Sequence, residues 1–280
     1  MRRFGPPVWP KLADRHDLDV MAVQTARRDW YVSHRSAALA EALSQLTQSY
    51  ADVVLSGFSM GAYAALLYSR AAHARGVLAV SPQYSIDPAV APFDIMRHHK
   101  FRLIGRPMPL PQDMGDTRVS GLLVYDPAIA ADRQHAALIA AHFPNLSRCA
   151  LPYGGHPATG ALNDAGAVGL VSDMVITDAI DPRAVRALHR RVRAQSGRYR
   201  LRLALAASER HPVRAAPLLR QIVQNPQAEA DQRLEAAIRL IDQQTPGAFE
   251  LLSQLLEDVP DPPHRWMGRI TRAIQRNGGF

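Results

Sequence analysis

The chain has 280 residues, of which 47% are hydrophobic and 6% aromatic, values typical of a globular protein with one large domain or two smaller ones. A single cysteine, Cys149, excludes a disulfide framework and a thiolate zinc site within one chain, and no apolar run approaches the ~18 residues of a membrane span. The net charge of +8 lies entirely in the last third: residues 1–181 hold 16 basic and 16 acidic residues, whereas residues 182–280 hold 17 arginines and 9 acidic residues.

The start of the chain has no pattern typical of a secretory leader. Residues 1–11 contain prolines in place of the continuous apolar run of a signal peptide. We therefore expect a cytoplasmic protein.

Residues 1–181 alternate short apolar runs with stretches of helical periodicity, which is typical of strand–helix–strand units. The expected strands, in chain order, are 18–23, 52–56, 77–81, 122–125 and 148–151. The expected helices are 36–50, 60–72, 133–142 and 163–180. The predicted fold class is therefore α/β, with a mostly parallel sheet and helices on both faces.

Residues 82–118 interrupt this alternation. Six prolines punctuate the stretch, and it shows no clean periodicity. It is too long for an ordinary connection, so it is either a lid or substrate-facing insertion or an irregular surface excursion.

A second region begins at residue 182. Asp181 and Pro182 form a pattern that favours the start of a helix, and the residues beyond are rich in Arg, Ala, Leu and Gln without a strand signal. A weak repeat of about 34 residues predicts an array of α-helical hairpins. We therefore predict two domains, 1–181 and 182–280. The helical region either binds a partner or packs on the first domain.

The strongest motif is the pattern G-x-S-x-G at residues 57–61, between an expected strand and an expected helix. Such a turn exposes its serine, Ser59, and leaves little room for neighbouring side chains, a demand that Gly57 and Gly61 meet. The backbone N–H of Met60, at the helix N-terminus, can donate to a developing oxyanion. The alternative is a glycine-rich turn whose serine only caps the helix.

Residues 57–66 resemble the nucleophile turn of the α/β-hydrolase superfamily, and the resemblance extends over about 14–181. It implies a Ser–His–Asp triad in the chain order serine, acid, histidine. Asp126, at the end of the strand 122–125, is the predicted acid. Asp87 and Asp132 are the alternatives, and Asp132 opens a helix, where its role could be merely that of an N-cap.

His156 is the predicted base. It lies in the loop after the last expected strand, and the two glycines before it permit a tight turn toward Ser59. It would accept the serine proton, while the acid orients its ring.

The front of the chain departs from the family. A full α/β-hydrolase has about three strands before the one expected at 18–23, and the loop after the third supplies a second oxyanion donor. Only residues 1–17 precede that strand here, and Gly5 is the nearest match to the missing donor. Trp30 and Tyr84 follow expected strands on the site side, where they can line the substrate pocket or simply pack.

These patterns predict a serine hydrolase acting on esters through an acyl-enzyme. An O-acyltransferase with a glycan acceptor, or a scaffold protein with a degenerate hydrolase domain, remains an alternative. We expect an ester of a small molecule or a glycan as substrate and no cofactor or metal, and residues 182–280 are a candidate binding region for a protein partner. The basic segment lacks a nucleic-acid motif, so nucleic acid is not the expected partner.

Overall fold

The computed structural model describes residues 6, 10–25 and 27–277. The chain forms two compact units, residues 1–190 and 191–280. A helix, α9 (Pro182–Val192), begins where the composition changes, and nearly all of it belongs to the first unit. The Asp181 carboxylate accepts a hydrogen bond from the Arg183 backbone N–H at 2.7 Å, which caps the start of this helix.

A four-stranded parallel sheet forms the centre of the first unit. Its strands are β1 (Val54–Phe58), β2 (Gly76–Val80), β3 (Ser120–Tyr125) and β4 (Leu146–Ala150), in the spatial order β1-β2-β3-β4. The α/β fold class is thereby confirmed. The carboxyl ends of all four strands meet at one edge, where sites form in open parallel sheets.

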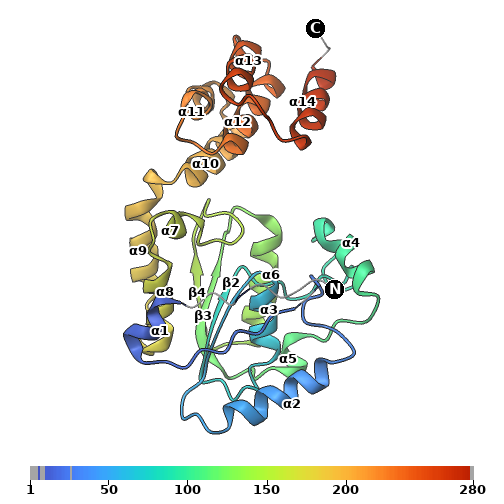
Figure 1. Ribbon diagram of the computed structural model, residues 1–280, viewed down its shortest axis with the longest axis vertical. Helices are drawn as coiled ribbons and strands as arrows, with labels where there is room; N and C mark the ends of the chain where they lie inside the picture. The colour runs from blue at the N-terminus through green and yellow to red at the C-terminus, as the bar shows by residue number, and fades with distance from the viewer. Residues whose placement is uncertain (1–5, 7–9, 26, 278–280) are drawn as a thin grey trace. The chain divides into compact units, whose positions relative to one another are not determined.

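Helices lie on both faces of the sheet (Figure 1). On one face α3 (Met60–Leu67) contacts β1 and β2, and α6 (Ala130–His142) contacts β3. Their small and aliphatic residues pack with the sheet into one buried cluster that includes Leu66, Leu123 and Ile139. On the other face α8 (Val168–Ile176) contacts β1 and β2. This burial on both faces explains why the two central strands, β2 and β3, consist largely of apolar residues.

Further helices belong to the first unit. They are α1 (Lys11–His16), α2 (Ser36–Thr47), α4 (Ile95–Ile104), α5 (Pro111–Met114) and α7 (Gly160–Asp164). Both α4 and α5 fall in the stretch 82–118, so the proline-rich insertion contains two helices that its irregular pattern did not reveal.

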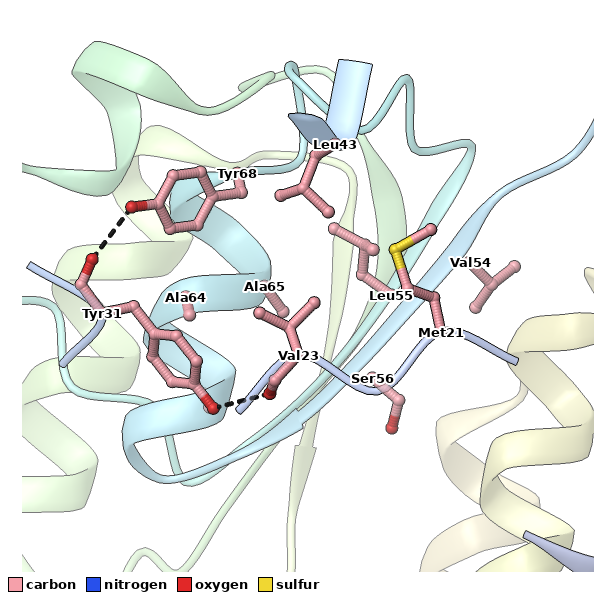
Figure 2. A pocket seen from close by; sticks show the side chains of 11 residues that line it. Met21, Val23, Tyr31, Leu43, Val54, Leu55, Ser56, Ala64, Ala65 and Tyr68 are labelled. Carbon is pink, nitrogen blue, oxygen red and sulfur yellow. Dashed lines mark hydrogen bonds between the residues drawn. The ribbon is translucent and has the colours of Figure 1, made fainter. Parts of the chain in front are cut away.

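The strand expected at 18–23 is wrong. That segment is extended but forms no strand, and β1 is the edge of the sheet in the described part of the chain. Met21 and Val23 keep 46% and 38% of their surface exposed, since nothing described covers their outer side. The Tyr31 hydroxyl donates to the Val23 carbonyl at 3.1 Å and holds the segment near β1 (Figure 2).

An apolar pocket of about 160 Å³ lies between this segment and β1. Figure 2 shows its lining, which includes Met21, Leu55 and Tyr68. The pocket therefore occupies a place where another strand could have continued the sheet.

The second unit consists of helices. They are α10 (Gly197–Arg210), α11 (Pro212–Gln224), α12 (Ala230–Asp242), α13 (Ala248–Asp258) and α14 (Arg265–Arg276), after a short 3₁₀ turn at Arg193–Gln195. α10 packs on α11, and α12 packs on α13, so the unit contains two successive helical hairpins. The expected all-α region is thereby confirmed.

Candidate functional site

Ser59 lies in a sharp turn between β1 and α3. Its backbone angles are φ 52° and ψ −117°, a conformation that non-glycine residues rarely adopt. Its N–H donates to the Val80 carbonyl at 2.8 Å, which ties the turn to the end of β2. The turn therefore holds the serine at the carboxyl edge of the sheet, as the motif predicts.

The two glycines of the motif have different roles. A Cβ placed on Gly57 would lie 2.2 Å from the Gly61 carbonyl oxygen, so a side chain cannot fit there. A Cβ on Gly61 would meet nothing within 4 Å. The turn sterically requires Gly57, whereas the expected requirement at Gly61 is wrong because that position faces open space.

Ser59, His156 and Asp132 form a chain of hydrogen bonds. Ser59 Oγ lies 2.7 Å from His156 Nε2, and His156 Nδ1 lies 3.0 Å from both carboxylate oxygens of Asp132. Because a carboxylate only accepts, Nδ1 carries the proton and the neutral ring presents its Nε2 lone pair to the serine. Asp132 is 2% exposed, so its charge acts on the ring with little screening by water.

The Nδ1 atom of His156 pairs with Asp132, so the structure gives Asp126 a different role from the one expected. Its carboxylate accepts hydrogen bonds from the backbone N–H groups of Ala128, Tyr153 and Gly155 at 2.9, 3.1 and 2.9 Å. Two of these donors belong to the loop that carries His156. Asp126 therefore positions that loop.

Asp132 belongs to the first turn of α6, but its side chain does not cap the helix. The N-cap residue is Ile129, which makes no side-chain capping bond. The expectation that Asp132 serves only as a cap is therefore wrong, since its carboxylate faces His156.

The loop 151–158 is tightly constrained. A Cβ on Gly154 would lie 1.8 Å from the Ala158 carbonyl oxygen, and Gly155 has φ 92°. The Ala158 N–H donates to Ser81 Oγ at 3.0 Å, which fixes the far end of the loop to the end of β2. The glycines before His156 therefore permit the tight turn that brings its ring to Ser59.

Gln83 presents a buried amide to the serine. Its Nε2 lies 3.3 Å from Ser59 Oγ and 3.1 Å from the Ser81 carbonyl oxygen, and the side chain is fully buried. The Trp30 indole N–H donates to Gln83 Oε1 at 2.9 Å. Because an indole N–H only donates, this contact identifies the amide oxygen and leaves the amide nitrogen facing Ser59.

The two predicted aromatic residues have no described contact with the catalytic side chains. Trp30 contacts Gln83, and the ring of Tyr84 is buried in the core and stacks on His142 with ring centres 5.6 Å apart. Neither aromatic side chain has a described contact with Ser59, and Gly5 lies outside the described residues. Met60 is the first residue of α3, so its backbone N–H is one of the first N–H groups of the helix, which have no acceptor within the helix.

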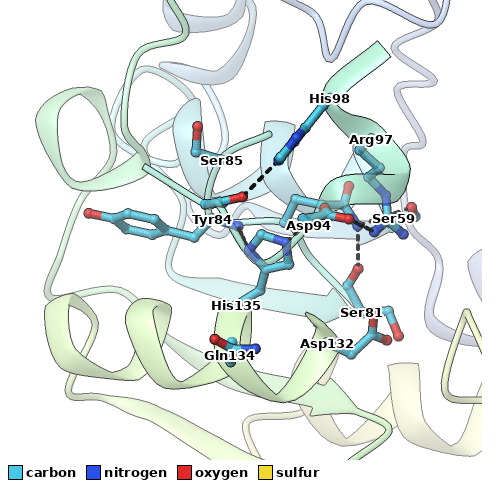
Figure 3. Close-up of polar contacts among 12 residues, drawn as sticks. Ser59, Ser81, Tyr84, Ser85, Asp94, Arg97, His98, Asp132, Gln134 and His135 are labelled. Atoms are coloured by element: carbon cyan, nitrogen blue, oxygen red, sulfur yellow. Dashed lines mark hydrogen bonds and ion pairs between the residues drawn. The ribbon is translucent and has the colours of Figure 1, made fainter. Parts of the chain in front are cut away.

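An ion pair from the insertion also reaches the site (Figure 3). Arg97, in α4, places its Nη2 atom 3.2 Å from His156 Nε2, while its Nη1 atom lies 3.0 Å from both carboxylate oxygens of Asp94. Asp94 also lies 3.0 Å from Nε2 of His135, a residue of α6. The carboxylate therefore joins the insertion to the helix that carries Asp132.

Burial would raise the pKa of Asp94, but the hydrogen bond from His135 and the charge of Arg97 outweigh it, so the net pKa is lowered. The His135 ring accepts the Tyr84 backbone N–H at Nδ1, 3.2 Å away, and thus donates from Nε2. Asp94 is consequently a fully buried carboxylate that stays charged and holds the Arg97 guanidinium in place.

Gln83, Asp94 and Arg97 did not emerge from the sequence. Gln83 lies three residues after the end of β2, so its position just beyond the carboxyl end of a strand was the available signal. The spacing of Asp94 and Arg97 on one helical turn was the signal for the ion pair, but the irregular pattern around them concealed α4.

Among residues 6, 10–25 and 27–277, no group of three or more His, Cys, Asp or Glu side chains could hold a metal ion. No helix in the same ranges is long and apolar enough to cross a membrane. Comparisons with protein-family models, curated proteins and solved structures find no match to this chain.

Proposed function

We propose that this protein is a serine hydrolase that cleaves esters, with Ser59 as nucleophile, His156 as base and Asp132 as the acid that orients the histidine. The observation that carries the proposal is the hydrogen-bond chain from Ser59 Oγ through both ring nitrogens to a buried carboxylate. A structural serine at a helix start has no need of a histidine whose tautomer is set in this way.

The fold supports the same proposal. A parallel sheet, a strand–turn–helix at Ser59, and an acid and a histidine further along the chain are compatible with an α/β-hydrolase-like domain. The order of residues along the chain, serine, then acid, then histidine, also agrees with that superfamily. The acid is Asp132, six residues later than expected.

The proposed reaction has two halves. Ser59 Oγ bonds to the ester carbonyl carbon while its proton passes to His156 Nε2, and the carbon–oxygen bond to the alcohol then breaks as that proton passes to the alcohol oxygen. Water attacks the acyl-enzyme, gives a proton to His156 and releases the acid, and the proton returns to Ser59. Asp132 stabilises the imidazolium in both halves.

Two donors are suited to the oxyanion of the tetrahedral intermediates. One is the Met60 backbone N–H at the start of α3, where the helix dipole also favours negative charge. We assign the second to the Gln83 amide, which already faces Ser59 Oγ and is held by Trp30. A side-chain amide would thereby take the role that a backbone N–H from a loop has in that superfamily.

The test is covalent labelling of the serine together with ester turnover. Wild-type protein should react with a fluorophosphonate probe and hydrolyse short aryl acetates, and Ser59→Ala should lose both while its circular dichroism is unchanged. Ser56→Ala, an exposed serine on the same strand, is the matched control and should retain both. Absence of labelling and turnover in folded wild-type protein would contradict the proposal.

A further inference from the structure

Arg97 and Ser59 each place a hydrogen-bond donor within reach of the same lone pair, that of His156 Nε2. In the tautomer set by Asp132, His156 Nε2 is an acceptor, and both Ser59 Oγ, at 2.7 Å, and Arg97 Nη2, at 3.2 Å, lie within reach of it. A ring nitrogen has a single lone pair, so the arginine contact competes with the serine contact that activates the nucleophile.

The contact also brings two positive charges together during the reaction. Once His156 has accepted the serine proton, its imidazolium would face the Arg97 guanidinium across this short distance, and like charges repel. The arginine does not simply swing away, because Asp94 accepts two hydrogen bonds from its Nη1 atom and is itself held by His135. A buried carboxylate thus keeps the cation beside the base.

An anionic group of the substrate would resolve this conflict. An anionic oxygen beside Nε2 would accept the Arg97 N–H, release the ring lone pair to Ser59, and lie between two positive charges as the imidazolium forms. The Arg97 side chain is 19% exposed, so a ligand can reach it, whereas Asp94 is 1% exposed and cannot be reached. Nε2 is also the atom that returns the proton to the departing alcohol, which places Arg97 on the alcohol side of the scissile bond.

We propose that Arg97 binds an anionic group on the alcohol part of the ester. The substrate class is then an ester of an alcohol that carries a carboxylate or phosphate close to the ester oxygen. This inference rests on the proposed hydrolase function and adds to it the chemical class of the leaving group.

Three acetyl esters test the effect of the leaving group alone, because all of them form the same acetyl-enzyme. The anionic ester is 3-acetoxybenzoate and the neutral one is 3-acetoxybenzamide, with 3-acetoxyphenyl phosphate as a second anion. We expect wild-type kcat/KM to favour the anionic esters by about 10- to 100-fold, as a charge-assisted hydrogen bond would give. Arg97→Met should abolish this preference, because kcat/KM should fall on the two anionic esters much more than on the neutral one.

Arg102→Met is the matched control, because Arg102 is an exposed arginine on the same helix, α4. It should keep the wild-type preference. A wild-type enzyme without preference, or an Arg97→Met variant that keeps it, would overturn the inference. An equal loss on all three esters would also overturn it, because it would assign Arg97 to the oxyanion.

A second measurement does not depend on turnover or on a folded variant. In wild-type protein, 3-hydroxybenzoate should slow fluorophosphonate labelling of Ser59 at concentrations at which 3-hydroxybenzamide does not. Equal protection by both compounds would contradict anion binding. If folded wild-type protein is neither labelled nor active on any of the three esters, the proposed hydrolase function itself fails. Activity on the esters without a preference for the anionic ones would instead contradict only the role of Arg97.

Discussion

At the scale of single residues, two carboxylates near His156 have separate tasks. Asp132 faces the ring, and Asp126 accepts three backbone N–H groups, two of them from the loop that carries the histidine. Both side chains are almost fully buried, with exposures of 2% and 1%. Their contacts, and not their burial, therefore decide what each contributes.

This difference predicts different effects of the same substitution at the two positions. Asp132→Asn should lower kcat on the order of 10⁴-fold, because the amide no longer fixes the required ring tautomer. Its unfolding midpoint should change little by comparison. Asp126→Asn should lower the free energy of unfolding by about 1–3 kcal/mol, because an amide cannot satisfy the same three donors.

Steady-state kinetics and urea denaturation of both variants provide the measurement. A larger loss of kcat in Asp126→Asn than in Asp132→Asn, with both proteins folded, would return the role of triad acid to Asp126.

At the scale of elements, the turn from β1 to α3 is the structure on which the site depends. The turn brings the strand backbone at Gly57 against the first turn of α3, and Ser59 adopts its strained conformation between them. The helix consists largely of alanine and leucine, and most of its length is buried against the sheet. Packing of this helix thus maintains the strain at the serine.

Substitution of the two glycines of the turn should have different effects on the free energy of unfolding. Gly57→Ala should cost at least about 3 kcal/mol of unfolding free energy, because its Cβ would overlap the Gly61 carbonyl and only a backbone shift relieves the overlap. Gly61→Ala should change that free energy by no more than about 1 kcal/mol and can raise it, because alanine favours a helix over glycine.

Urea denaturation with a constant m value measures both changes. Equal effects of the two substitutions would show that the nearby Gly61 carbonyl does not exclude a side chain at residue 57.

At the scale of the whole molecule, the site belongs to the first unit, and the second unit has a core of its own. Residues of α10–α14 form that core, with Trp266 fully buried. The guanidinium of the buried residue Arg233 donates to the Val223 carbonyl and pairs with Asp258. The prediction that residues 182–280 bind a protein partner stays a prediction.

Cys149, in β4, reports on the integrity of the first unit. Its side chain is fully buried, and burial raises the pKa of the thiol from 9.0 to about 11, although the charge of Arg186 acts in the opposite direction. The folded protein should not react with a disulfide reagent such as Ellman's at pH 8, and the denatured chain should react with one equivalent.

The same shift predicts a pH dependence of stability. Above about pH 9 the thiol of the unfolded chain ionises, while the folded thiol keeps its proton until about pH 11, so stability should fall across that window. Cys149→Ala should reduce this fall. Rapid labelling of the native protein at pH 8 would contradict the burial on which both expectations rest.

Several features could be predicted from local sequence alone. The alternation of apolar runs and helical periods identified all four strands of the sheet, and the signal is clearest in β2 and β3, which are buried on both faces and largely apolar. The turn at Ser59 and the loop at His156 were predicted because glycines leave a clear signal where backbones approach closely. The helical character of the last third followed from its composition and spacing.

The tertiary structure alone decided which groups meet at the site. Asp126 and Asp132 both lie near the carboxyl end of β3, and the paths of α6 and the loop 151–158 determine which one faces His156. Gln83 and Arg97 come to Ser59 and His156 through contacts between residues distant in sequence, which leave no periodic pattern. Local propensities determine elements, whereas the partners of a polar side chain depend on how those elements pack.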